Sequence, residues 1–288
     1  MRKVVFDEGP HTYTDTDTNQ QYISVTTLIG KYEIPFDTHY WSTYKGCKDV
    51  LENVHMWEKY KRKAGGWKDV VAHFERNKAG RFTEDVINRI NWYVNKWEFA
   101  KNSACAAGTK IHKQKEEEIL AQDGIETSSG VRLTAIESCD IDHLKRVKNG
   151  VFPELLVYDT EYDIAGQVDL VYKKGKKIII KDYKTNNEIS REAFADNKMK
   201  VPLDNLLDST FNHYMLQMSL YAWILERQGY EIVELELIHL DRETGDVIDE
   251  IEVPYVPDLV EKMVKHYRSE HRKVVKGSML NVWVKIKE

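Results

Sequence analysis

The sequence predicts an α/β fold in which a central mixed β-sheet is flanked by helices and carries a helical insertion in its N-terminal part. Residues 167–173 and 177–184 are rich in β-branched and aromatic types and are separated by Gly-Lys, which is typical of a β-hairpin. Residues 207–228 carry apolar side chains at helical spacing. Residues 38–107 are interpreted as a separate helical region. At 288 residues the chain is long enough for one large domain with such an insertion.

The remaining segments complete this architecture. Residues 3–23 predict short strands joined by a turn rich in Asp, Thr and Asn. Ser24 is expected to cap a helix that continues to Tyr32 and ends before Pro35. Towards the C-terminus, residues 232–253 predict a second hairpin and residues 257–275 an amphipathic helix. The three expected parts are residues 1–37 (strands and a helix of the core), 38–107 (the helical insertion) and 108–288 (the main part of the core).

The predicted insertion holds five of the seven tryptophans of the chain and is broken by Gly65-Gly66. Most of these indole rings are expected to pack in a core or between helices, because burying them contributes strongly to stability. The five residues are Trp41, Trp57, Trp67, Trp92 and Trp97.

The predicted hairpin brings three ionisable side chains together. With Gly175-Lys176 as a two-residue turn, Asp169 lies directly opposite Asp182. Asp182 and Lys184 share a face, because side chains two apart on a strand point the same way. An odd-length loop with a bulge would break this register. The apolar run 178–180 suits a strand covered on both faces, where an idle aspartate and lysine would be costly to bury.

Four more residues join these three as candidates, although each also has an ordinary structural explanation. His112 follows Gly108 in a helix-like segment, and a lone helical histidine is usually a surface group. Glu154 follows Pro153 at the expected start of the strand 154–158, and it is equally well explained as a strand-edge acid. Gln217 and Tyr221 lie on the apolar stripe of the helix predicted over 207–228, where a buried glutamine needs a hydrogen-bond partner.

The order of these motifs resembles that of the RecB-type nucleases within the PD-(D/E)xK superfamily, which includes lambda exonuclease. The series is G-x-x-x-H, P-E, G-x-V-D, D-Y-K-T and Q-x-x-x-Y, and it covers residues 108–221. The chain is more closely similar to the mitochondrial genome maintenance exonuclease and related phage proteins, which share an early Ser-Val-Thr segment, here 24–26, and a following tryptophan, here Trp41. Asp182 stands where many relatives carry Glu, and both acids occur at this position across the superfamily.

The resemblance implies a restriction-endonuclease-like core and a metal-dependent DNA exonuclease that hydrolyses phosphodiester bonds, acting on single-stranded DNA or DNA ends in replication, recombination or repair. Hard oxygen ligands suit Mg²⁺, and Mn²⁺ is expected to substitute for it. The chemistry makes Asp169 and Asp182 metal ligands. The resemblance adds the main-chain carbonyl of Tyr183 and the His112 side chain as further ligands. Whether one metal or two act is left open.

The resemblance also implies roles for the other candidates. Lys184 is expected beside the attacking water, where its charge stabilises the transition state. Gln217 and Tyr221 would position Lys184 or the scissile phosphate, and Glu154 would complete the catalytic group. In the mitochondrial relatives a helical arch admits single-stranded DNA, and residues 38–107 occupy the corresponding stretch. One or two of the tryptophans would then stack on unpaired bases.

Charge is expected to act locally, because the net charge of −5 argues against tight, salt-tolerant coating of duplex DNA. Each candidate basic patch is by default a solvated face. The three patches are Lys59, Lys61, Arg62 and Lys63; Lys173, Lys174, Lys176 and Lys177 at the hairpin tip; and Arg272, Lys273 and Lys276.

Two other functions remain open. One is a structure-selective endonuclease with the same metal site, and the other is a DNA-end-binding accessory protein without turnover. The presence of Asp169, Asp182 and Lys184 argues against the second, because a retired site would be expected to lose one of them. Strand polarity, DNA versus RNA selectivity and oligomeric state are not encoded in these patterns, and replication or recombination proteins are expected as further partners.

Cysteine content and the chain start constrain the setting. Cys47, Cys105 and Cys139 are the three cysteines, with no C-x-x-C pair, so neither a cysteine-rich zinc site nor a four-cysteine iron–sulfur cluster is expected. The first residues lack the features of a signal or transit peptide, and no apolar run approaches the roughly 20 residues of a membrane span. We therefore expect a cytoplasmic protein of a bacterium or a phage-infected host.

Overall fold

The computed structural model describes residues 3–78, 80–122, 124–126, 132–137 and 139–285, with side chains described up to His271. The chain forms two compact units. Residues 1–34 and 108–288 make up the first, here called the core unit, and residues 35–107 make up the second, here called the helical unit. Each unit is described by itself.

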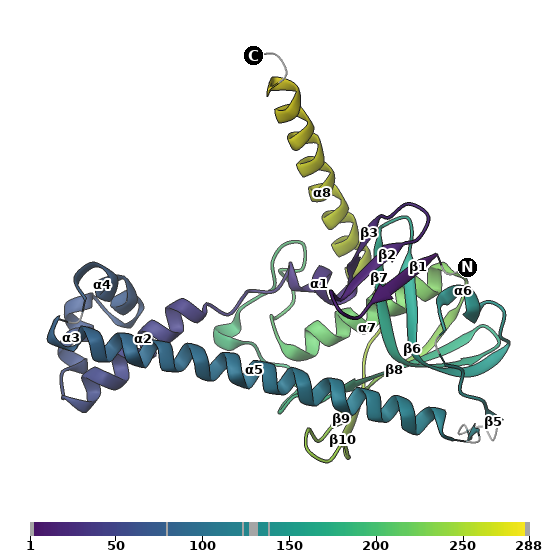
Figure 1. Ribbon diagram of the computed structural model, residues 1–288, viewed down its shortest axis with the longest axis horizontal. Coiled ribbons are helices and arrows are strands. Elements are labelled where there is room, and N and C mark those ends of the chain that lie inside the picture. The colour runs from purple at the N-terminus through teal and green to yellow at the C-terminus, as the bar shows by residue number, and fades with distance from the viewer. Residues whose placement is uncertain (1–2, 79, 123, 127–131, 138, 286–288) are drawn as a thin grey trace. The chain divides into compact units, whose positions relative to one another are not determined.

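The core unit is built on a mixed β-sheet of eight strands (Figure 1). The strands follow the order β1-β2-β3-β7-β8-β9-β10, and β6 pairs with β7 outside this path. The β3–β7 and β8–β9 pairs are parallel and the others antiparallel. The predicted mixed sheet flanked by helices is therefore confirmed. The strands are β1 (Val4–Asp7), β2 (Thr12–Asp15), β3 (Gln21–Ser24), β6 (Asn149–Asp159), β7 (Ile164–Lys174), β8 (Lys177–Lys184), β9 (Glu231–Leu240) and β10 (Val247–Glu252).

Strand β7 has an unusual arrangement of partners. Strand β6 pairs with it along its whole length, so β3 and β8 must share its other edge. Strand β3 pairs with Ile164 and Ala165, whereas β8 pairs with residues 170–174. The Gly-Gln-Val-Asp motif at 166–169 lies between these two partners. A break in the backbone ladder therefore falls on the motif that carries Asp169.

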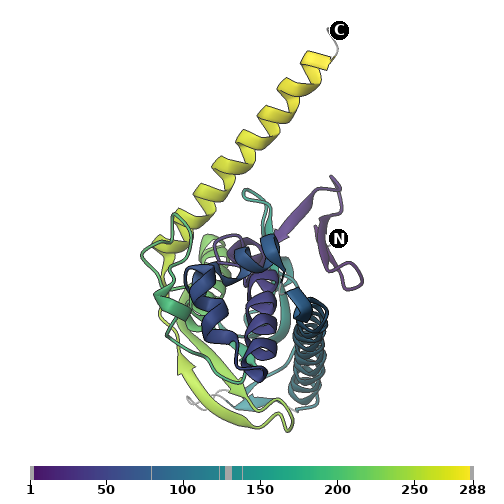
Figure 2. The same ribbon diagram turned by 90° about the vertical axis from the view of Figure 1, so that its left-hand side faces the viewer.

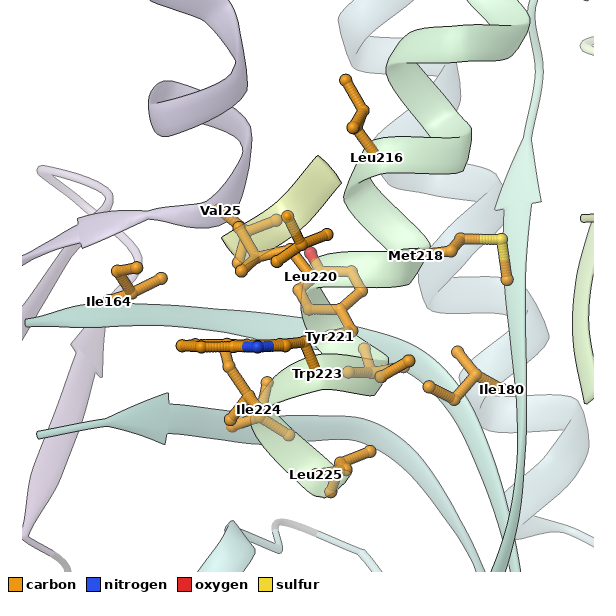
Figure 3. Close-up of a cluster of buried hydrophobic side chains, with 14 of the residues drawn as sticks. Val25, Ile164, Ile180, Leu216, Met218, Leu220, Tyr221, Trp223, Ile224 and Leu225 are labelled. Carbon is orange, nitrogen blue, oxygen red and sulfur yellow. The ribbon is translucent and has the colours of Figure 1, made fainter. Parts of the chain in front are cut away.

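Helix α7 (Thr210–Arg227) packs against the sheet and provides much of the core. Its residues 215–225 are all buried, which explains why its apolar face is not a narrow stripe. Leu216, Leu220 and Ile224 gather with Ile164 and Ile180 of the sheet in Figure 3. The helix begins where the Ser209 hydroxyl accepts a hydrogen bond from the amide of Asn212 (3.4 Å).

The terminal helices of the core unit differ in length from the predictions. Ser24 caps α1 (Val25–Gly30) as expected, but the helix ends at Gly30 rather than at Tyr32. Tyr32 instead donates a hydrogen bond from its hydroxyl to the Met263 carbonyl (3.1 Å). Its amide still donates to the Ile29 carbonyl (2.8 Å), so Tyr32 closes the last turn of α1 from outside the helix. Helix α8 (Pro257–Lys285) is ten residues longer than the predicted 257–275.

The shorter elements of the core unit are a two-stranded sheet of β4 (Ile125–Glu126) and β5 (Arg132–Leu133), helix α6 (Ile141–Leu144) and the 3-10 turn η3 (Phe194–Asp196).

The prediction that residues 178–180 are covered on both faces was partly wrong. Ile178 and Ile180 are fully buried, but Ile179 between them is only half-buried.

Among the described residues, no helix combines the length and the apolar character that a membrane span requires.

The helical unit is the group of purple and dark-blue helices in Figures 1 and 2. Its core gathers Cys47, Leu51, Trp57, Phe74 and Val86. Its elements are α2 (Thr38–Asn53), α3 (Trp57–Ala64), the 3-10 turn η1 (Trp67–Asp69), α4 (Val70–Asn77), the 3-10 turn η2 (Gly80–Phe82) and the first part of α5 (Thr83–Leu120), which continues into the core unit.

The expectation that most tryptophans of residues 38–107 pack in a core or between helices holds for Trp57 and does not hold for Trp67 and Trp92. Trp57 is 5% exposed, but Trp67 is 46% and Trp92 is 43% exposed, and Trp41 and Trp97 are half-buried. The unit is small, so its core has room for few indole rings. The remaining rings cover its surface.

Candidate metal and catalytic site

Three carboxylates line up across neighbouring strands of the core unit. The β6–β7 register places Glu154 opposite Asp169. The β7–β8 pairing, with Gly175-Lys176 as the turn, ends at Leu170 opposite Lys181, so Asp169 and Asp182 are the next residues of the same register, just beyond the ladder. Glu154 lies in the middle of β6, so the prediction that it opens a strand was wrong. The prediction relied on Pro153, because proline often stands at the first residue of a strand, but β6 begins four residues earlier and continues through Pro153.

Glu154 has an unusual backbone conformation. Its φ is +47°, in the left-handed region that non-glycine residues rarely adopt. Such strain persists only where the surrounding structure imposes it, and it is frequent at functional sites. Here Glu154 interrupts the regular β6–β7 pairing, which includes Pro153 and Leu155 on either side of it. The interruption falls at the residue whose carboxylate lies beside Asp169.

His112 of α5 completes a group of possible metal ligands. One ligand atom from each of His112, Glu154 and Asp169 lies within 4.8 Å of the others. The His112 Nδ1 is 3.5 Å from the Asp169 Oδ2. Helix α5 can approach because Gly108 has no side chain, since a Cβ there would lie 3.3 Å from the Thr185 Oγ1. This close approach gives the glycine of the G-x-x-x-H motif a physical reason.

Asp182 lies at the centre of a second set of contacts. It is fully buried and forms an ion pair with Lys184. The Gln217 amide of α7 donates to the Asp182 Oδ1 (3.3 Å) and to the Tyr221 hydroxyl (3.4 Å). Gln217 therefore positions Asp182 directly, and its buried amide has the partners that its location requires. All the side chains predicted for the site meet in this region.

Tyr183 contributes through its backbone. Its amide donates to the Asp169 Oδ2 (2.7 Å), so a side chain takes the place of a strand partner where the β7–β8 ladder has ended. This bond fixes the orientation of the Asp169 carboxylate. The expected role of the Tyr183 carbonyl as a metal ligand stays a prediction.

Electrostatics in the site reflect several charges taken out of water. Burial and the neighbouring Asp169 raise the pKa of Glu154 to about 8. Burial and Asp169 likewise raise the pKa of Asp182 to about 6. Burial also acts to raise the pKa of Asp169, but His112 and Lys184 outweigh it and hold that pKa below its usual value. For His112, burial would lower the pKa, yet Asp169 raises it to about 9.

These shifts describe a site that needs positive charge. Three carboxylates crowd together beside His112 and Lys184, and the raised pKa of Glu154, about 8, favours a protonated carboxyl there until a cation binds. Two or three carboxylate oxygens with one imidazole form a donor set suited to a divalent cation. The residues present therefore fit a divalent metal, held by Glu154, Asp169 and His112 with Asp182 beside them.

Gly166 makes room for the helix that carries Gln217. A Cβ at this position would lie 2.7 Å from the Tyr221 Cε1 and 3.2 Å from a methyl group of Val25. The glycine of the G-x-V-D motif thus allows Tyr221 to pack onto the strand next to the acids. The close packing of α7 on β7 therefore explains why the motif carries glycine at this position.

Three residues around Lys184 were not predicted as part of the site. The Lys184 ammonium lies 4.6 Å from the ring centre of Tyr214, whose hydroxyl donates to the Asn186 side chain (2.5 Å). Arg242 donates from Nε to the Thr185 carbonyl (3.1 Å). Tyr214 was visible in the sequence on the same helical stripe as Gln217 and Tyr221. Arg242 had no such signal, because only the parallel β8–β9 pairing brings its turn to this edge of the sheet.

The predicted basic patch at the hairpin tip was wrong in one residue. Lys173 is 5% exposed, and its ammonium donates to the carbonyls of Val147 (2.6 Å) and Lys148 (3.1 Å). It therefore stabilises a neighbouring loop rather than offering its charge to a ligand. The side chains of Arg272, Lys273 and Lys276 lie outside the described residues.

Comparison with known proteins agrees with this geometry. No match to the chain was found among curated proteins. The family model of the PD-(D/E)XK nuclease superfamily matches residues 59–281, which include every acid, the histidine and the lysine described above. Nucleases of this superfamily use divalent metal ions, as the donor set requires. Because the match spans most of the chain and the acids converge as that chemistry demands, the chain belongs to the PD-(D/E)XK nuclease superfamily.

Proposed function

We propose that the protein is a Mg²⁺-dependent DNA exonuclease of the RecB-type, lambda-exonuclease-like branch, similar to the mitochondrial and phage enzymes named above. It hydrolyses phosphodiester bonds in single-stranded DNA or at DNA ends. The observation that carries the proposal is the convergence of Asp169, Asp182 and Lys184 from two adjacent strands, with Glu154 and His112 beside them. Mn²⁺ is expected to replace Mg²⁺.

The acidic side chains and His112 would hold the metal. Asp169 and Asp182 would be ligands as the sequence predicts, with Asp169, Glu154 and His112 close enough together to bind one ion and the Tyr183 carbonyl completing the set. When bound, the metal supplies a Lewis acid that activates water and neutralises charge on the phosphoryl oxygens. The Tyr183 amide and the Gln217 amide fix the two aspartates before substrate arrives, so little reorganisation is required.

Lys184 would act on the attacking water and the crowded phosphoryl group. Burial would lower the pKa of its ammonium, but Asp182 and Asp169 raise it, so the group stays protonated at neutral pH. A permanent positive charge beside the carboxylates favours hydroxide over water and stabilises the negative charge of the transition state. Tyr214 holds the ammonium against its ring.

A preference for unpaired DNA is supported by the composition of the helical unit. Residues 35–107 contain 13 Lys and Arg against nine Asp and Glu, a net charge of +4, although the whole chain carries −5. The rest of the chain is therefore at −9. Trp67, which is 46% exposed, lies in this same unit. Positive charge interleaved with exposed aromatic rings suits single strands, whose bases are free to stack.

Site variants test the proposal. Asp182→Ala and Lys184→Ala should each abolish cleavage of end-labelled DNA in Mg²⁺ while leaving DNA binding largely intact, because they remove a ligand or the charge beside the water. Lys181→Ala is the matched control, since Lys181 pairs with Glu236 on the opposite face of the same strand. Cleavage by the Lys184→Ala protein at the parental rate would contradict the proposed role.

Comparing cleavage of different DNA substrates distinguishes an exonuclease from an endonuclease and from a binding protein. Linear and circular DNA, each single- and double-stranded, are incubated with the protein and Mg²⁺. An exonuclease degrades linear strands and spares circles. Degradation of circular single-stranded DNA would instead identify a structure-selective endonuclease, and binding of DNA ends without cleavage would identify an accessory protein.

A further inference from the structure

The helical unit contains a pocket that is separate from the carboxylate site. It has a volume of about 600 Å³ and is lined by Tyr44, Lys61, Arg62, Gly65, Gly66 and Trp67. These residues come from α2, from the end of α3 and from the turn that follows it. The lining thus combines two aromatic rings with two cations. A nucleotide offers the complementary groups, a flat base and a negatively charged phosphate.

The two glycines keep one wall of the pocket open. Gly65 and Gly66 have φ values of +104° and +132°, a conformation that residues with side chains rarely adopt. Their amides donate to the carbonyls of Arg62 (3.2 Å) and Lys61 (3.1 Å) and so cap the end of α3. Because these amides are already used, an anion in the pocket must be bound by side chains.

Trp67 provides the flat surface. Its indole is 46% exposed, which is costly for so large an apolar group. The Tyr44 ring meets it edge-on at 6.3 Å between ring centres and also contacts the buried Trp57, so Trp67 is held in place by the core of the unit. The Lys68 ammonium lies 5.5 Å from its ring centre and adds positive charge nearby.

Lys61 and Arg62 provide the charge for a phosphate. Lys61 contacts the Glu58 carboxylate (2.7 Å), but that carboxylate side chain is 68% exposed, and exposed ion pairs contribute little free energy. Exchange of Glu58 for a phosphate therefore costs little. Among the described residues, Arg62 donates from one of its five N–H groups, to the Glu58 carbonyl (3.4 Å). The Asp69 carboxylate lies beside Gly65, where its Oδ2 would be 3.3 Å from an added Cβ, and its charge disfavours a phosphate next to that glycine.

We propose that this pocket binds one unpaired nucleotide of a DNA strand, with its base stacked on Trp67 and its phosphate held by Lys61 and Arg62. The inference rests on the proposed function for the choice of DNA as ligand. It assigns the recognition of unpaired strands to the helical unit and leaves hydrolysis to the carboxylates. A duplex would not fill the pocket, because its bases are already stacked on each other.

Binding without turnover tests the pocket. The full-length protein is titrated in EDTA into a fluorescein-labelled oligothymidylate, an abasic oligomer of the same length and a duplex, and anisotropy is measured. Trp67→Ala should weaken oligothymidylate binding about tenfold, equivalent to about 1.4 kcal/mol, and change abasic binding little. Trp67→Phe should retain most of the affinity, because it keeps an aromatic face. Lys61→Ala should weaken binding of both single strands, since it removes a phosphate contact.

Two variants serve as matched controls. Trp92→Ala removes an equally exposed indole of the same unit that is also flanked by cations, Arg89 and Lys96, but does not line the pocket. Lys59→Ala removes an exposed charge from the same helix as Lys61. Both should bind as the parent does. Thermal unfolding of each variant checks that the fold is retained.

The outcomes separate the two proposals. Unchanged oligothymidylate binding by Trp67→Ala, or an equal loss in Trp92→Ala, would overturn the pocket. Tighter binding of thymidine monophosphate than of the oligomer would overturn the strand assignment and leave a mononucleotide site. If the Trp67 and Lys61 variants bind normally and the parent still cleaves in Mg²⁺, the pocket is wrong and the nuclease proposal stands. If Trp67→Ala weakens binding as expected and the parent does not cleave, the pocket proposal stands and the nuclease proposal is wrong.

Discussion

Glycine residues decide how closely the site can be assembled. Gly108 and Gly166 both lie where a neighbouring side chain approaches to within 3.3 Å of a would-be Cβ. The first lets the helix with His112 approach β8, and the second lets Tyr221 pack onto β7. Neither glycine has a positive φ, so the reason for glycine is space rather than backbone conformation.

Gly166→Ala should reduce cleavage by about ten- to a hundredfold, because Tyr221 and the adjacent Gln217 must shift and small misplacements of a site are costly. Overpacking at this position should also cost about 1–3 kcal/mol of unfolding free energy. Single-turnover cleavage and denaturant unfolding measure the two effects. Tyr221→Phe is the control, since it keeps the ring and removes only the hydroxyl. Parental cleavage by Gly166→Ala would show that the ring moves aside freely.

Tyr214 is expected to position Lys184 through its ring. Tyr214→Leu should lower kcat about fivefold to tenfold with little change in KM, because a cation–π contact contributes about 0.5–2 kcal/mol when it is shielded from water. Tyr214→Phe keeps the ring and loses only the bond to Asn186, so it should retain most of kcat. Steady-state kinetics with single-stranded DNA measure both. An equal loss in the two variants would assign the effect to the hydroxyl instead.

Helix α2 crosses α5 at a single small residue. A Cβ on Gly46 would lie 2.7 Å from the Ile90 side chain and 3.2 Å from backbone atoms of Ile90 and Val86. Side chains can move away, but two helix backbones must separate to accommodate the added carbon. The packing of the helical unit therefore depends on this position, which the sequence alone does not distinguish from any other glycine within a helix.

Gly46→Ala should destabilise the helical unit by about 1–3 kcal/mol, despite the better helix propensity of alanine. Thermal unfolding followed by tryptophan fluorescence measures it, because the buried Trp57 lies in this core. Gly30→Ala is the control, since nothing lies within 4 Å of a Cβ there. A gain in stability at Gly46 would mean that the crossing is looser than these distances indicate.

At the scale of the whole molecule, charge is divided between two units. The core unit is acidic and carries the candidate metal site, and the helical unit is basic and carries the proposed nucleotide pocket. The overall charge of −5 conceals this division. Metal binding should therefore stabilise the core unit, since it relieves repulsion among buried carboxylates.

Ca²⁺ should bind the site and stop turnover, because its looser coordination seldom supports this displacement. At about 100 times its Kd it should add about 2.7 kcal/mol to the stability of the folded protein, a rise of several degrees in Tm. Differential scanning calorimetry with and without Ca²⁺ measures the shift, and Asp169→Asn should remove it. A shift that persists in Asp169→Asn would place the metal elsewhere.

The sequence by itself determined the local elements and which side chains of β7 and β8 share a face. Turn chemistry at Gly175-Lys176 and the two-residue period of strands sufficed to predict the observed register, in which Leu170 pairs with Lys181 and Asp169 and Asp182 follow directly. These are short-range constraints, because each depends on backbone geometry within a few residues. The predicted mixed sheet flanked by helices also followed from such patterns, and it is confirmed.

Only the tertiary structure decided which distant segments complete the site. The position of Glu154 within β6, the reach of His112 from α5 and the arrival of Arg242 beside Thr185 all depend on which strands pair and where helices approach. Burial was also decided there, since Lys173 and Trp67 have the opposite exposure from that expected of their residue types. The physical reason is that pairing and burial are properties of surfaces brought together from far along the chain, whereas sequence periodicity describes one element at a time.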